Sequence, residues 1–336
     1  FPPAMQTSWL NVHARYQCRH SGACCSSGWP IPVEVSRVAA LDRAVAAGRL
    51  DAGGGPWLDP APGAPEEVAG VFRHDGGGRC VFRQAGRCAV HQALGPGALP
   101  AACLHFPRVC LVDDRGVFVT LSHYCPTTAA LTLDFEGPVA VVAGPPAIPG
   151  GDIPEGLDAR GELPPLFDER RLMSLDEYAA WERAAVTRLG AAADPAAVID
   201  ALEMEAGGAP RRRDTLARFD EVCAAVPAPL DWPPAPADAD EAWRELAASL
   251  PGASAVAGRY LAARAFASWV AYQGRGLQAV VRSLDAAFAV FRVEVARQRA
   301  AGLAPRDALR EALRQSDLLL VHYADRQALA DAWSRA

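Results

Sequence analysis

The stretch Cys18-Arg19-His20-Ser21-Gly22-Ala23-Cys24-Cys25 opens a segment in which cysteines, more than hydrophobic periodicity, decide the fold. The chain has nine cysteines, and eight of them lie between Cys18 and Cys125. An odd number of spaced cysteines in a reducing compartment is typical of metal ligands or reactive thiols, not of a disulfide framework. The sequence therefore predicts a cysteine-ligated metal centre in the N-terminal third.

Seven cysteines are candidate metal ligands. In an extended chain, adjacent side chains point to opposite sides, so the pair Cys24-Cys25 favours a multi-iron cluster or two neighbouring metals over one structural zinc ion. Cys125 precedes Pro126 at the predicted start of a short helix, where the helix dipole favours a thiolate. The predicted ligands are Cys18, Cys24, Cys25, Cys80, Cys88, Cys103 and Cys125.

The other two cysteines are interpreted as packed core residues, because Cys110 lies in a predicted strand and Cys223 on a predicted helix. Four histidines stand beside candidate ligands, and each can replace a thiolate at one corner of the site. Hydrogen bonding or solvent exposure is the ordinary alternative for each of them. These histidines are His20, His91, His105 and His123.

The predicted fold class is mainly α. Residues 1–135 are expected to form a small α+β domain that a metal stabilises, with a helix over 32–50 and short hairpins around Gln84-Ala85-Gly86 and Asp113-Asp114-Arg115-Gly116. The Pro/Gly-rich stretch 136–165 reads as a linker. Residues 166–336 are expected to be an all-helical domain, because amphipathic stretches follow one another at 174–189, 195 onward, 213–226, 238–250, 255–272, 277–300, 305–314 and 317–333.

Composition excludes several classes of protein. The 336 residues are 51% hydrophobic, and 33 basic against 39 acidic residues give a net charge of -6, which argues against a nucleic-acid or anionic-membrane binder. All the basic residues are arginine, since the chain contains no lysine. No apolar run approaches the ~20 residues that span a bilayer, so we expect a soluble, cytoplasmic protein. An upstream targeting segment stays open, because the sequence begins at Phe1.

Four motifs, in order, resemble the flagellin lysine-N-methylase family, which belongs to the CxxCxxCC group of zinc- or iron-chelating proteins. The resemblance covers about the first 135 residues, although five residues separate Cys18 from Cys24 and the literal CxxCxxCC is absent. The matching stretches are Cys18…Cys24-Cys25-Ser26-Ser27-Gly28-Trp29, Cys80-Val81-Phe82…Cys88-Ala89-Val90-His91, Leu99-Pro100…Cys103…Phe106-Pro107-Arg108 and Leu121-Ser122…Cys125-Pro126.

The resemblance implies methyl transfer from S-adenosylmethionine to lysine amines of a protein substrate such as flagellin, with a 4Fe–4S cluster required. A non-catalytic zinc- or iron-chelating protein is the alternative, and an electron-transfer module is a weaker third. The residues themselves assign no cofactor pocket. Gly53-Gly54-Gly55 and Gly76-Gly77-Gly78 lack the continuation of a dinucleotide-binding loop and read as ordinary loops.

His123 and Tyr124 are the candidate catalytic residues. A lysine amine must be neutral to accept a methyl group, and its ordinary pKa is about 10.4, so the site must desolvate it or supply a base. These two side chains lie next to Cys125 at the predicted helix start. The alternative is that both pack beneath the loop.

Overall fold

The computed structural model describes residues 6–148, 156–209, 214–228, 230 and 232–335. The chain divides into two compact units. Residues 17–106 form one, here called the cysteine-rich unit, and residues 1–16 with 107–336 form the other, the helix-rich unit. The predicted boundary at 135 is therefore misplaced, because residues 107–135 pack with the C-terminal helices and the cysteine-rich unit is inserted into the sequence of the other.

A five-stranded sheet lies in the helix-rich unit. Its order is β10-β7-β8-β1-β9, with β7 and β8 antiparallel, β1 parallel to β8, β10 parallel to β7, and β9 antiparallel to β1. The predicted hairpin around Asp113 to Gly116 is confirmed as β7 and β8, but it belongs to this sheet. The bounds are β1 Thr7–Leu10, β7 Arg108–Asp113, β8 Gly116–Leu121, β9 Val141–Ala143 and β10 Gly156–Asp158.

Strands also occupy stretches that the sequence analysis assigned to linker or helix. β9 and β10 fall within 136–165, of which residues 149–155 lie outside the described part of the chain. A small hairpin of β11 (Leu166–Asp168) and β12 (Arg171–Leu172) opens the region expected to be all-helical. The mainly helical class is confirmed, whereas the all-helical C-terminal domain is not, because its helices share a core with the sheet.

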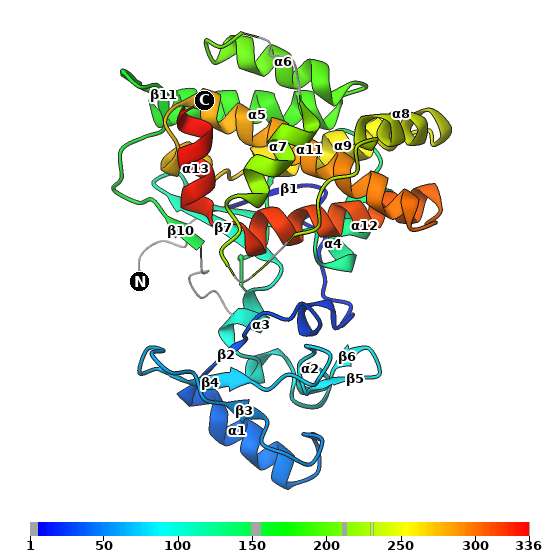
Figure 1. Cartoon of the computed structure of the whole chain (residues 1–336). Coiled ribbons are helices and arrows are strands. Elements are labelled where there is room, and N and C mark those ends of the chain that lie inside the picture. Colours follow the sequence, from blue (N-terminus) through cyan, green and yellow to red (C-terminus); the bar gives the residue numbers. More distant parts are fainter. Residues whose placement is uncertain (1–5, 149–155, 210–213, 229, 231, 336) are drawn as a thin grey trace. The chain divides into compact units, whose positions relative to one another are not determined.

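The longest helix, α11 (Leu277–Ala300), runs through the helix-rich unit and packs against α7, α8, α12 and α13 (Figure 1). Its residues from Leu277 to Ala296 are almost all buried, so it forms the centre of the core. The other helices of this unit are α4 Pro126–Asp134, α5 Leu175–Gly190, α6 Pro195–Glu205, α7 Thr215–Cys223, α8 Ala239–Ser249, α9 Ala253–Ala265, α10 Val270–Gln273, α12 Pro305–Asp317 and α13 Arg326–Arg335.

Helix starts follow the predicted capping signals. Ser174 and Glu177 form the predicted capping box of α5, and Asp194 caps α6 ahead of Pro195. The helix predicted over 213–226 is α7, and residue 213 lies outside the described residues.

Two predicted helices are broken. The stretch 255–272 divides into α9 and α10, because Ala267 adopts a left-handed φ of 54° and its N–H donates to Glu182 Oε1 at 3.0 Å instead of continuing a helix. The stretch 317–333 divides into a π-helix, η3 (Leu318–Tyr323), and α13. Residues at both breaks line one cavity.

The cysteine-rich unit has a small hydrophobic core of its own. Trp57, Phe72 and Phe82 pack their rings together, with centroids 5.4 to 6.0 Å apart, over the buried Leu41 of the predicted first helix. A three-stranded sheet of order β2-β4-β3 and a two-stranded hairpin β5-β6 surround this core. The elements are η1 Ala23–Cys25, β2 Pro32–Glu34, α1 Val35–Ala46, β3 Leu58–Asp59, β4 Val68–Phe72, β5 Arg83–Gln84, β6 Arg87–Cys88, α2 Ala89–Leu94, η2 Pro96–Ala98 and α3 Ala101–His105.

Across the described parts of both units, no helix is both long enough and apolar enough to cross a membrane.

Candidate metal centre

Cys25 is the centre of a group of thiols in the cysteine-rich unit. The side chains of Cys24, Cys80 and Cys88 are close enough to that of Cys25 to raise its pKa by hydrogen bonding. The Sγ atoms of Cys24 and Cys25 are 3.9 Å apart. Three separate stretches of sequence supply these four thiols, so the fold of the unit brings them together.

The Sγ atoms of Cys24 and Cys25 approach one another because both residues lie in a tight helical turn, η1. A 3₁₀ turn has about three residues per revolution, so successive side chains are separated by about 120° and not by the half-turn of an extended chain. The expectation that adjacent cysteines point apart is therefore wrong here. The adjacency of Cys24 and Cys25 is therefore no argument against a single metal ion.

Gly22 precedes this turn and lies against the hairpin that carries Cys88. Its φ is +68°, and a Cβ atom at this position would lie 2.6 Å from the carbonyl oxygen of Gly86. Gly86 occupies the turn between β5 and β6, and Cys88 ends β6. Only glycine combines this backbone conformation with this close approach, which places η1 beside Cys88.

Cys80 is tied to Cys25 through the backbone. The Cys80 N–H donates to the Cys25 carbonyl oxygen at 2.8 Å, and both residues are buried. The main chain thus fixes the separation of these two cysteines before their side chains make any contact.

The thiols of the group differ in acidity. Hydrogen bonds to Cys24, Cys80 and Cys88 raise the pKa of Cys25, and the hydrogen bond with Cys25 lowers the pKa of Cys24. The same bond, assisted by the backbone N–H groups at the start of α2, lowers the pKa of Cys88 to about 7. A metal cation would replace the protons of these thiols, because thiolates are the ligating form.

A fifth thiol, Cys103, lies within electrostatic reach of this group. Burial raises the pKa of Cys103, and the neighbouring Cys24, Cys88 and Cys80 raise it further. Its helix, α3, begins where the Ala101 N–H donates to Glu34 Oε1 at 2.9 Å. That bond holds Cys103 on the same side of the unit as the other thiols.

The donor set suits a thiolate-bound metal. Zinc–sulfur bonds of about 2.3 Å in a tetrahedron place sulfurs about 3.8 Å apart, close to the Cys24–Cys25 separation of 3.9 Å. Four sulfurs also match an iron–sulfur cluster. As they stand, no three His, Cys, Asp or Glu side chains of the described residues form a group that could hold a metal ion. The thiols therefore fit in number and chemistry, and side-chain rotation would have to complete the geometry.

Two predicted ligands have different surroundings. Cys18 is exposed, and its Sγ accepts a hydrogen bond from the His20 N–H at 3.4 Å. Cys125 belongs to the helix-rich unit, where it stands at the N-terminus of α4 as predicted and its Sγ lies 3.9 Å from the Tyr16 hydroxyl. Of the two cysteines interpreted as core residues, Cys110 in β7 is buried and Cys223 on α7 is partly buried against the core.

The histidines near the cysteines are arranged in pairs or networks. His20 and His91 lie against one another in the cysteine-rich unit, with ring centroids 3.9 Å apart, and burial with the charge of His20 lowers the pKa of His91. His105 ends α3 and is half-buried. His123 lies in the helix-rich unit.

The candidate catalytic residues are buried. His123 uses Nδ1 to donate to Asp317 at 2.9 Å, and its Nε2 is 2.9 Å from the Thr132 hydroxyl. The Tyr124 ring lies under the guanidinium of Arg314, 5.2 Å from its centroid, and is also buried. Both side chains have the packed surroundings of the alternative interpretation.

Sequence reasoning missed the residue that brings η1 to the hairpin. The signal for Gly22 was a glycine directly before Ala23-Cys24-Cys25, where a turn needs a left-handed residue. Its partner Gly86 is 64 positions further along the chain, and nothing in the pattern links the two.

No family model, curated protein or solved structure matches this chain.

Proposed function

We propose that the cysteine-rich unit binds a metal centre through the thiolates of Cys24, Cys25, Cys80 and Cys88, with Cys103 as an alternative or additional ligand. The observation that carries this proposal is the 3.9 Å separation between Cys24 Sγ and Cys25 Sγ, with Cys80 and Cys88 close enough to raise the pKa of Cys25. Four converging cysteines with little exposure have few other uses in a chain whose nine cysteines are all free.

Two occupants are compatible with these residues. The resemblance to flagellin lysine-N-methylases favours a 4Fe–4S cluster. The short Cys24–Cys25 separation favours a single tetrahedral ion such as zinc. When bound, a cluster would supply redox-active iron, whereas zinc would crosslink the unit.

Metal analysis of protein purified without oxygen tests the proposal and separates the two occupants. About four iron and four sulfide per chain with a brown colour supports the cluster. One or two zinc ions without sulfide supports the alternative, a non-catalytic chelating protein. Protein that is folded and free of metal after growth in iron- and zinc-replete medium contradicts both.

For the whole chain we propose S-adenosylmethionine-dependent methylation of lysine in a protein substrate of the flagellin type. The support is the order and spacing of the four motifs that resemble that family. In this reaction the neutral lysine nitrogen attacks the methyl carbon, the carbon–sulfur bond breaks, and the nitrogen loses a proton. Free thiols throughout the chain suit a reducing compartment, and we propose the cytoplasm.

Mass spectrometry of a lysine-containing flagellin fragment, incubated with metal-loaded protein and S-adenosylmethionine, tests the activity. Addition of methyl-sized masses on lysine supports it. Because the chain itself contains no lysine, every methylated lysine must belong to the substrate. Absence of methylation with an intact metal centre, on any lysine protein from the source cell, would leave the chelating function.

A further inference from the structure

A cavity of about 60 Å³ lies within the helix-rich unit, at the two breaks in helical structure. Ala267, between α9 and α10, and Leu320, on the π-helix, both line it. Left-handed non-glycine residues and π-helical turns cost free energy and occur often at binding sites. Two such irregularities at one cavity are typical of a binding site.

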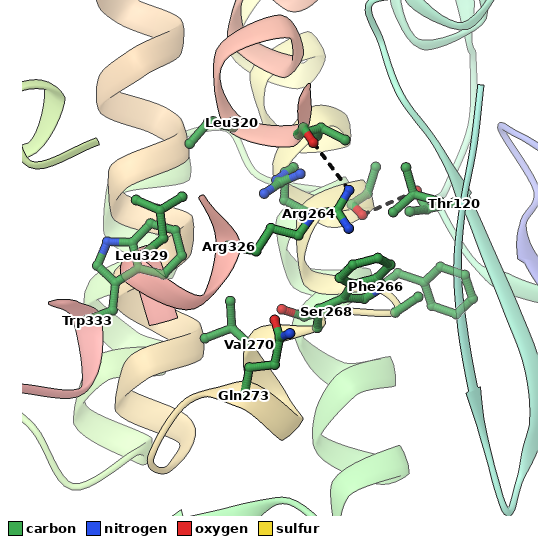
Figure 2. A pocket seen from close by; sticks show the side chains of 15 residues that line it. Thr120, Arg264, Phe266, Ser268, Val270, Gln273, Leu320, Arg326, Leu329 and Trp333 are labelled. Carbon is green, nitrogen blue, oxygen red and sulfur yellow. Dashed lines mark hydrogen bonds between the residues drawn. The ribbon is translucent and has the colours of Figure 1, made fainter. Parts of the chain in front are cut away.

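Two arginines reach into this cavity. Figure 2 shows the guanidinium groups of Arg264 and Arg326 next to one another among the lining side chains. None of the described residues that line it is acidic. The remaining wall is largely apolar or aromatic and includes Phe266, Trp269, Val270 and Trp333.

Arg326 has no carboxylate partner among the described residues. It donates from Nη2 to the Val321 carbonyl oxygen at 3.2 Å, and its guanidinium lies 3.8 Å from the centroid of the Trp269 ring. Burial, reinforced by the charge of Arg264, lowers the pKa of Arg326 to about 10. Its positive charge is thus poorly compensated inside the protein.

Arg264 is only weakly paired. Its Nη1 atom is 3.9 Å from Asp317 Oδ1, which already accepts a hydrogen bond from the Tyr260 hydroxyl at 3.1 Å. The nearby His322 is neutral or cationic and cannot balance the charge of either arginine. Of these two adjacent cations, only Arg264 lies near a carboxylate of the described residues, and that carboxylate also accepts a hydrogen bond from Tyr260.

We propose that this cavity binds a small organic carboxylate, with the carboxylate on the guanidinium groups of Arg264 and Arg326 and an apolar body against Trp269 and Phe266. Paired N–H groups of arginine match the two oxygens of a carboxylate, and the apolar wall gains by covering a hydrocarbon or aromatic group.

Fluorine NMR of 4-fluorobenzoate added to the whole protein tests the proposal. We expect saturable binding to the wild type and binding at least about tenfold weaker in Arg326→Gln and in Arg264→Gln, because each loses a charge-assisted hydrogen bond. The control Arg310→Gln, on the exposed face of α12, should bind as the wild type does. Circular dichroism verifies that each variant is folded, and either cavity variant alone is sufficient for the comparison.

Two further probes define the ligand. The neutral 4-fluorobenzamide should bind at least about tenfold more weakly than the carboxylate, because it has no charge to pair with arginine. Inorganic phosphate should compete poorly, because it has no apolar body. The proposal is overturned if no carboxylate binds saturably, if neither arginine variant changes the affinity, or if phosphate binds as tightly as 4-fluorobenzoate.

Discussion

Asp317 Oδ2 accepts hydrogen bonds from both the backbone N–H and the ring Nδ1 of His123, at 2.6 and 2.9 Å. This relationship joins the residues before α4 to the end of α12 inside the helix-rich unit. Burial acts to raise the pKa of Asp317, but His123 and then Arg264 outweigh it, and the pKa falls to about 2. His123 therefore holds a structural carboxylate in place, which reduces its value as a base for an outside substrate.

Asp317→Asn should lower the free energy of unfolding by about 2 to 3 kcal/mol, because it weakens several hydrogen bonds to a buried charge. Urea denaturation followed by circular dichroism measures the change. Asp307→Asn on the same helix is the matched control, since its pair with Arg310 is exposed and should cost less than about 1 kcal/mol. Equal losses in the two variants would contradict the structural role.

His322 should make stability depend on pH. Burial lowers its pKa to about 4, with Arg326 and Arg264 also lowering it and Asp317 opposing them. Between about pH 4 and 6.5 the unfolded chain binds one more proton than the folded chain, so the free energy of unfolding rises with pH across this window. The contribution of His322 to stability is lost on acidification to about pH 4. The shift corresponds to roughly 3 kcal/mol.

Urea titrations at several pH values test this dependence. His322→Gln should flatten the slope between pH 4 and 6.5 without abolishing it, because burial also lowers the pKa of His13. A variant slope equal to that of the wild type would show that His322 does not titrate in this way.

Two arginines in the same Asp-x-Arg geometry separate buried from exposed ion pairs. Arg115 pairs with Asp113 at 2.7 Å and with Glu182 at 3.3 Å, and both carboxylates are buried. Arg160 pairs with the exposed Asp158 at 2.5 Å. Arg115→Met should cost about 3 to 5 kcal/mol and Arg160→Met less than about 1 kcal/mol. Thermal and urea unfolding measure both, and similar values would refute the difference.

Gly22→Ala should disrupt the thiol group without removing a thiol. In the variant, the alanine Cβ would clash with the Gly86 carbonyl and strain the left-handed backbone, so η1 should move away from the hairpin. The free energy of unfolding should fall by about 2 kcal/mol or more. Reaction of the metal-free protein with a thiol reagent should then be faster at Cys25. Gly76→Ala, where a Cβ meets no atom within 4 Å, should leave the rate unchanged.

The cysteine substitutions test the ligands one by one. Cys25→Ser should remove most of the metal, because Cys24, Cys80 and Cys88 all lie close enough to affect the pKa of Cys25. Cys103→Ser reports whether the fifth thiol is a ligand. Cys223→Ser should retain the wild-type metal content, since this residue packs on the core of the helix-rich unit. Loss of metal in Cys223→Ser would contradict the placement of the site.

The sequence predicted local elements well and long-range partners poorly. Capping residues such as Ser174 and Asp194 act within one helical turn, so their helices could be located from the pattern. The sheet could not be predicted, because β1 pairs with β8, a strand 110 positions later. The four residues of β1 contain no pattern that identifies this partner. The domain boundary at 135 failed for the same reason.

In the candidate site, too, local features could be predicted and long-range contacts could not. The cysteines could be identified by type and spacing, and five of the seven predicted ligands lie in the cysteine-rich unit, although no three side chains of the described residues form a group that could hold a metal ion. Whether Cys24 and Cys25 point the same way depended on the turn conformation, which a left-handed Gly22 decides. The cavity with Arg264 and Arg326 could not be predicted, because these two arginines come from two stretches whose helices break where periodicity predicts continuity.

The insertion of residues 17–106 between β1 and β7 has a consequence for synthesis on the ribosome. At about 5 to 20 residues per second, β1 emerges several seconds or more before β8 exists to pair with it. The cysteine-rich unit is complete within that interval. The proposed metal would then bind to this unit before β1 pairs with β8, so loading of the metal would precede completion of the five-stranded sheet.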